Sequence, residues 1–264
     1  LARAIAAQPS PAFEEALLRL ADGESDAALV EVARAMGAVR RPRFLPALLG
    51  MLDRREVRAE ARAALLAFGD EGLAFLDAAL GDRGMPVELR RQLPRTISLF
   101  ARGPAAAALE RHLLEEPSDS VRYRTLRGMN RLAAAPDVAF DPDVLRRATD
   151  ATLEGVFRLV HWRVVLERGA KEVPSRATAG HGLLVQLLRD KEEQAVERLF
   201  RLLALQHPGE DFKGIYRGLQ STDARARGSS RELLENVLGP QRRGAVLAVV
   251  EEAGYEARLA GAGD

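Results

Sequence analysis

Apolar residues recur at helical spacing in short stripes that glycine or proline turns separate. Within 54–82, one helical face carries Val57, Ala61, Ala64, Leu65 and Phe68. This stripe ends at Gly69, and a second one begins at Leu73 and Leu76. The pattern predicts two short paired helices, and neither of them can bury its apolar face alone.

The helix pair repeats every 32 residues. The column that ends the first helix is Met36, Phe68, Phe100 and Leu132, and a neighbouring column is Ala33, Leu65, Ile97 and Met129. A third column, Val57, Leu89 and Val121, is followed each time by arginine, at Arg58, Arg90 and Arg122. A second apolar helix follows, at 45–52, 73–80 and 105–114. The period predicts an all-α solenoid of stacked helix pairs, regular over 26–135, whose core includes Leu65, Phe68, Ile97, Phe100 and Met129.

The period lapses after residue 140. One long helix is expected over 141–170, covered by neighbours along most of its length, with a loop at 172–182. We therefore expect an irregular unit at about 141–190, with Trp162 as a packing anchor. Helix pairs return over 191–254, followed by a frayed end at 255–264, and the whole chain is expected to form one domain, 1–264.

Composition narrows the classes of function. The chain has no cysteine, which excludes disulfides, thiolate zinc sites and cysteine nucleophiles, and fits a reducing compartment such as the cytoplasm. Its longest apolar runs are shorter than the roughly 18 to 20 residues of a membrane span. The net charge of +1 gives no global basic field for nucleic acid, although a local basic strip remains open.

Catalytic and metal-binding motifs are not found. The four histidines stand singly, and adjacent acids such as Glu115–Glu116 point apart on a helix, so we interpret them as solubilising charge. We expect no enzyme activity and no cofactor.

The repeat, with Asp, then Val-Arg, then Ala and Leu at helical spacing, resembles bacterial HEAT repeats of the short, lyase-associated type. Over about 190–250 the chain also resembles the HEAT-repeat region that follows an ATP/ADP-translocase-like transporter segment in some bacterial fusion proteins. The matching residues are the runs 198–203, 210–211, 215–219 and 232–238, with Asp223 and Arg225. The resemblance implies a cytoplasmic scaffold or regulatory region, at the inner face of the membrane if such a segment precedes it.

Three functions compete on these grounds. The first is a non-catalytic scaffold that binds a protein partner on a curved helical surface and is not itself inserted in the membrane. The second is a nucleic-acid-binding protein that resembles the HEAT-like alkylpurine DNA glycosylases; specific nucleic-acid binding is not expected. The third is a phycobilin-lyase-type protein. A basic strip for the second would comprise Arg58, Arg90, Arg122, Arg124 and Arg131. Arg58, Arg90 and Arg122 are also candidates for a row that binds a partner; alternatively, the arginine that follows each valine pairs with the acidic turn of the adjacent repeat.

A partner site is also predicted where the repeat is interrupted. Binding residues concentrate on loops that a rigid scaffold holds, and the loop at 172–182 follows the long helix. We expect Arg163, Arg176 and His181 to lie near one another on the concave side or its rim and to contact a partner or ligand.

Overall fold

The computed structural model describes residues 1–250, and these residues form helices joined by turns, with no strand among them. The predicted all-α class is therefore confirmed. The chain divides into two compact units, Leu1–Phe140 and Asp141–Asp264. The boundary falls where the 32-residue period lapses, and the prediction of one domain over 1–264 stays a prediction.

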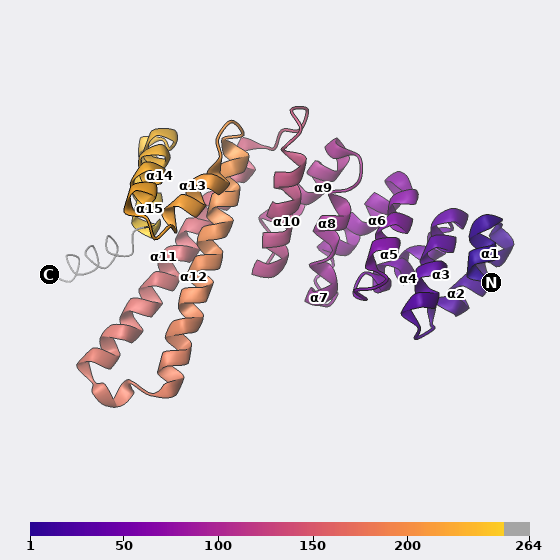
Figure 1. The fold of residues 1–264 in the computed structure, drawn as a ribbon, viewed down its shortest axis with the longest axis horizontal. Helices are drawn as coiled ribbons and strands as arrows, with labels where there is room; N and C mark the ends of the chain where they lie inside the picture. Colours follow the sequence, from indigo (N-terminus) through magenta and orange to yellow (C-terminus); the bar gives the residue numbers. More distant parts are fainter. Residues whose placement is uncertain (251–264) are drawn as a thin grey trace. The chain divides into compact units, whose positions relative to one another are not determined.

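The N-terminal unit is a succession of short helices that pack in chain order (Figure 1). They are α1 (Ala2–Ala7), α2 (Glu14–Ala21), α3 (Asp26–Val39), α4 (Leu45–Met51), α5 (Arg58–Ala67), α6 (Gly69–Gly81), α7 (Val87–Arg90), α8 (Leu93–Ile97), α9 (Arg102–Leu113) and α10 (Asp119–Leu132). Helix α3 packs on α1 and α5, and α8 packs on α6 and α10. The first helix of a repeat thus packs against the first or the second helix of a neighbouring repeat.

The repeat columns form much of the core of this unit. Ala33, Leu65, Ile97 and Met129 are completely buried. Phe68 is buried as predicted, but Phe100 is only partly buried, so its place in the core was predicted wrongly. The third repeat differs from the others because its first helix is split into α7 and α8 just before Pro94. Proline has no N–H to continue the hydrogen-bond ladder, and its ring clashes with the preceding turn.

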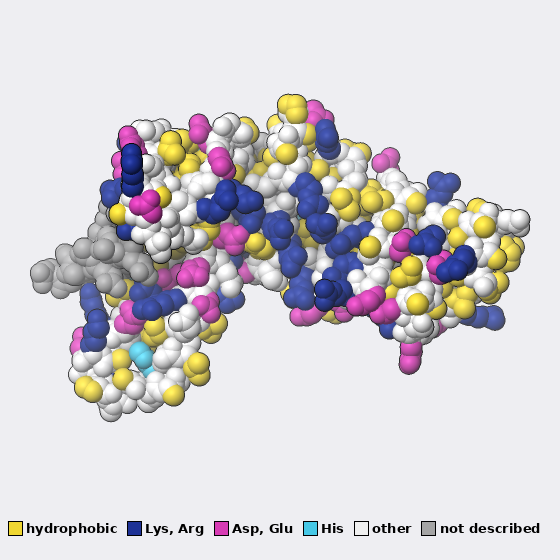
Figure 2. Space-filling view, in the orientation of Figure 1, with side chains coloured by type: hydrophobic (Ala, Val, Ile, Leu, Met, Phe, Trp, Pro, Cys, Tyr) yellow, Lys and Arg dark blue, Asp and Glu magenta, His cyan; other side chains and the backbone are white. Residues whose placement is uncertain are grey.

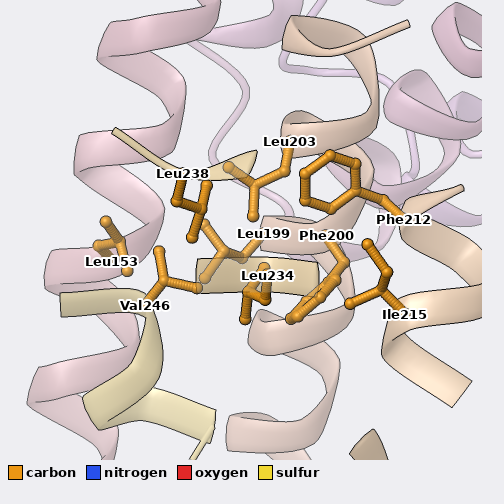
Figure 3. Close-up of a cluster of buried hydrophobic side chains, with 9 residues drawn as sticks. All are labelled: Leu153, Leu199, Phe200, Leu203, Phe212, Ile215, Leu234, Leu238 and Val246. Atoms are coloured by element: carbon orange, nitrogen blue, oxygen red, sulfur yellow. The ribbon is translucent and has the colours of Figure 1, made fainter. Parts of the chain in front are cut away.

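The C-terminal unit is built on a hairpin of two long helices, α11 (Pro142–Glu172) and α12 (Ala179–Gln206). Three shorter helices follow: α13 (Phe212–Leu219), α14 (Ala224–Val237) and α15 (Pro240–Val250). Helix α13 packs on α12 and on α14, and α15 packs on α14 and on α11 (Figure 1). Nine buried side chains from all five helices form the core shown in Figure 3: Leu153, Leu199, Phe200, Leu203, Phe212, Ile215, Leu234, Leu238 and Val246.

The hairpin corrects three expectations. The predicted loop at 172–182 is shorter, because Thr178 caps α12 by accepting a hydrogen bond from the His181 N–H at 3.2 Å. Residues 183–206 therefore belong to one continuous helix and not to an irregular end followed by a new helix pair. Helix α11 has buried residues from Leu145 to Val164, as expected, but Trp162, predicted as a packing anchor, is 50% exposed. The expected frayed end at 255–264 lies outside the described residues.

Candidate anion-binding groove

A cavity of about 260 Å³ in the N-terminal unit has a strongly basic lining. Its wall is formed by Arg58, Arg62, Gln92, Arg95, Ser98, Arg124, Arg127, Gly128 and Arg131. Six of these nine residues are arginines, and no Asp or Glu belongs to the lining. We call this cavity the arginine groove; it lies within the dark blue area over α8 and α10 in Figure 2.

Helical spacing brings the guanidinium groups together. On α10, Arg124, Arg127 and Arg131 follow one another at intervals of three and four residues, which places them on one helix face. A Cβ atom on Gly128 would lie 3.1 Å from the Pro94 carbonyl oxygen and 2.8 Å from a Leu109 methyl group. The missing side chain of Gly128 therefore lets α10 approach α8 closely.

On the other side of the groove, Arg62 makes only neutral contacts in the described chain. Its Nε lies 3.3 Å from Thr96 Oγ1, and its Nη2 lies 3.5 Å from Gln92 Oε1. Among residues 1–250, no carboxylate forms an ion pair with Arg95 or Arg124. These cations therefore face one another without neutralisation.

The neighbouring repeat shows the contrast. Arg34 on α3 is neutralised by Glu31 and by Glu60 of α5, each at 3.0 Å. The repeat column that contains Glu60 continues through Gln92 to Arg124, so the same position changes from acidic to neutral to basic. Positive charge therefore accumulates towards α10, although the net charge of the chain is only +1.

Burial and the crowding of cations lower the pKa of two of these arginines. Burial, followed by repulsion from Arg95, Arg58, Arg124 and Arg131, lowers the pKa of Arg62 to about 10. Burial, Arg95 and Arg127 also lower the pKa of Arg131. An anion bound in the groove would relieve this repulsion, because an opposite charge favours the protonated guanidinium.

The arginines that follow the column of Val57, Leu89 and Val121 do not form one row over the groove; of Arg58, Arg90 and Arg122, only Arg58 lines it. Arg58 donates to the carbonyl oxygens of Leu52 and Asp53, and Arg122 donates to that of Glu116.

Arg90 is 2% exposed and pairs with the Glu116 carboxylate, which comes from the turn of the next repeat. Of the two interpretations of these arginines, a binding strip or pairing with an adjacent acidic turn, the second therefore holds for Arg90. Glu116 itself is 1% exposed, so its interpretation as solubilising charge was wrong.

The residues predicted at the interruption of the repeat have separate structural contacts. Arg163 is buried, and its Nε lies 2.9 Å from Glu192 across the hairpin. His181 is hydrogen-bonded to the Leu166 carbonyl oxygen at 3.0 Å, whereas Arg176 is exposed. The structure brings His181 and Arg176 to the end of the hairpin and places Arg163 in its seam. A partner contact for any of the three stays a prediction.

Sequence reasoning named Arg58, Arg124 and Arg131 but missed Arg62, Arg95 and Arg127. A signal was present in the repeat alignment, because Arg95 and Arg127 occupy one column 32 residues apart. Only the closeness of α5, α8 and α10, however, shows that these side chains share one cavity.

The C-terminal unit has a further cavity of about 370 Å³ that also contains cations. There, Arg242 pairs with Asp150 at 3.0 Å and with the Gln206 side-chain oxygen at 3.1 Å. This neutralisation makes the cavity a weaker anion site than the arginine groove.

In comparisons with known proteins, no family model, no curated protein and no solved structure matches the chain. Within the described chain, no three His, Asp or Glu side chains converge as a metal site. No helix within residues 1–250 is long and apolar enough to cross a bilayer.

Proposed function

We propose that the chain is a non-catalytic scaffold, a solenoid of HEAT-type helix pairs in the cytoplasm, whose arginine groove binds an acidic segment of a partner protein. The observation that carries this proposal is the set of six guanidinium groups that line one cavity without a carboxylate among them. A role beside a transporter-like membrane segment remains part of the same proposal.

The chemistry of the lining suits carboxylates. A guanidinium group binds a carboxylate through two parallel hydrogen bonds, and such charge-assisted bonds are about twice as strong as neutral ones. Along α10, the seven-residue step from Arg124 to Arg131 spans about 10 Å. An extended peptide covers that length with about three residues, so alternate acidic side chains on one face of the peptide match the row.

Nucleic acid is the competing ligand, because the same arginines can bind phosphates. The lining, however, has no aromatic side chain on which a base could stack. A cavity of about 260 Å³ also admits single anionic side chains and not a duplex. We expect duplex DNA to bind weakly and non-specifically, with a Kd of about 10⁻⁴ to 10⁻⁶ M near physiological salt.

The test measures the affinity of a fluorescent peptide of alternating Glu and Ser by anisotropy. The groove variant Arg95→Gln/Arg124→Gln/Arg127→Gln should weaken binding at least about a hundredfold, because a hydrogen bond to a charged group contributes about 1.5–3 kcal/mol. The control variant, Arg19→Gln/Arg102→Gln/Arg111→Gln, removes the same charge outside the groove and should change the affinity less than about fivefold. Equal losses in the two variants, or tighter binding of a duplex than of the peptide, would overturn the proposal.

A further inference from the structure

The end of the α11–α12 hairpin carries a concentration of exposed apolar side chains. Ten large apolar residues of the described chain are exposed, and six of them fall between residues 162 and 187: Trp162, Val165, Val173, Leu183, Leu184 and Leu187. Leu183 is the most exposed of the six, at 74%. We call residues 162–187 the hairpin end; Figure 2 shows apolar side chains on the distal part of the hairpin. Exposed apolar side chains gathered in one region mark an interaction surface more often than scattered ones do.

The hairpin does not need these side chains for its own packing. Its seam is already filled by Val156, Val160 and Val164 of α11 and Ala195 of α12. The buried pair of Arg163 and Glu192 also joins the two helices. The six exposed apolar residues therefore lie outside the contacts that hold the hairpin together.

The exposed charges at the hairpin end are mostly positive. Residues 171–180 are exposed without interruption, and the exposed cations of the hairpin end are Arg168, Lys171 and Arg176. Within residues 1–250, none of these three has an ion-pair partner. Glu172 is the single exposed acid there, because Glu167 is only partly exposed and pairs with Arg163 and Arg189.

We propose that the hairpin end docks onto the surface of an anionic lipid bilayer. Exposed leucines, a tryptophan and unpaired basic residues are the combination that binds the interface between headgroups and acyl chains. The amphipathic indole of Trp162 suits that interface. A second copy of the hairpin end fits less well, since two surfaces with the same excess of positive charge repel each other.

Trp162 provides a direct measurement, because it is the single tryptophan of the sequence. Its emission should shift to shorter wavelength when the protein is mixed with vesicles of phosphatidylcholine and phosphatidylserine. Brominated acyl chains should then quench it. Vesicles of pure phosphatidylcholine should give at least about a hundredfold weaker binding, because each of the three cations contributes about fivefold near an anionic surface.

Substitutions separate the hairpin end from the rest of the chain. Leu183→Ser/Leu187→Ser should weaken vesicle binding about a hundredfold, since each half-inserted leucine contributes about tenfold. The control variant Leu99→Ser/Leu233→Ser removes two other exposed leucines and should bind as the wild type does. Circular dichroism of both variants should match the wild type, because the exchanged side chains are exposed.

Three results would overturn the proposal. The first is an unchanged Trp162 emission at millimolar anionic lipid. The second is a lipid-independent shift that grows with protein concentration and accompanies a dimer in sedimentation, because a second copy would then cover the surface. The third is equal vesicle binding by the wild type and Leu183→Ser/Leu187→Ser. The groove variant defined above should keep the Trp162 response, which separates this proposal from binding in the arginine groove.

Discussion

Replacing Glu116 by alanine should destabilise the N-terminal unit severely. The carboxylate of Glu116 is 1% exposed and pairs with Arg90, which is 2% exposed. It also accepts a hydrogen bond from Arg83 at 2.7 Å and one from the Ser118 N–H at 2.8 Å. Its loss would leave the Arg90 guanidinium buried without its counter-charge.

The size of this destabilisation follows from the burial of the Arg90–Glu116 pair. Removing one partner of a buried ion pair costs about 3–5 kcal/mol, because the remaining charge stays desolvated. For a unit of this size, the loss lowers the melting temperature by roughly 10–20 °C. Thermal and urea unfolding followed by circular dichroism would measure it, with the transition of the C-terminal unit as an internal reference.

Two further variants make this prediction specific. Glu115→Ala removes an adjacent but exposed carboxylate and should change the stability by less than about 0.5 kcal/mol. Arg90→Met/Glu116→Leu removes both buried charges and should recover most of the loss, because apolar side chains of similar size can replace a buried pair. Equal stability of Glu115→Ala and Glu116→Ala would show that the buried Arg90–Glu116 pair does not hold the N-terminal unit together.

Three other predictions concern close packing, charge repulsion and pH. Gly128→Ala should destabilise the N-terminal unit by about 1–3 kcal/mol, because its new methyl group would lie 2.8 Å from a side-chain carbon. Gly155→Ala should stabilise α11 by about 0.5–1 kcal/mol, because nothing lies within 4 Å of its new methyl group. The midpoints of urea unfolding compare the two variants. Without ligand, Arg124→Gln should raise the free energy of unfolding by about 0.5 kcal/mol, and with it the melting temperature, because it removes repulsion between cations. The same variant should weaken peptide binding, because it also removes a binding group. A lower melting temperature would contradict this prediction. Burial lowers the pKa of His207 below its usual 6.5, so at low pH protons bind preferentially to the unfolded chain. The C-terminal unit should therefore lose stability as pH falls below about 6.5. His207→Gln should remove this dependence of the free energy of unfolding on pH, measured by unfolding curves at several pH values.

Helix content and much of the N-terminal core could be predicted from the sequence because a 32-residue period fixes which positions face neighbouring helices. The completely buried column from Ala33 to Met129 illustrates this. Phe100 escaped the rule because the first helix of its repeat is split before Pro94 and ends at Ile97, so that Phe100 lies beyond the end of α8. The long hairpin was also not predicted. Helix α12 continues through residue 190, because no proline or glycine interrupts it there.

The arginine groove could be predicted only in part. Charge at single positions is visible in the sequence, and Arg124 and Arg131 were named on that basis. Whether an arginine is neutralised depends on distant carboxylates, such as Glu116 for Arg90, and these partners are brought close only by the fold. The overall charge of +1 hides the groove because the acids that balance it lie elsewhere.

The affinities of the wild type and of the two charge-matched triple variants for the alternating Glu and Ser peptide decide whether the arginine groove binds acidic segments. At physiological salt, we predict that the wild type and the variant at Arg19, Arg102 and Arg111 bind the peptide alike. The variant at Arg95, Arg124 and Arg127 should bind it at least about a hundredfold more weakly. Identical affinities for the two variants would show that the arginine groove is not the peptide-binding site.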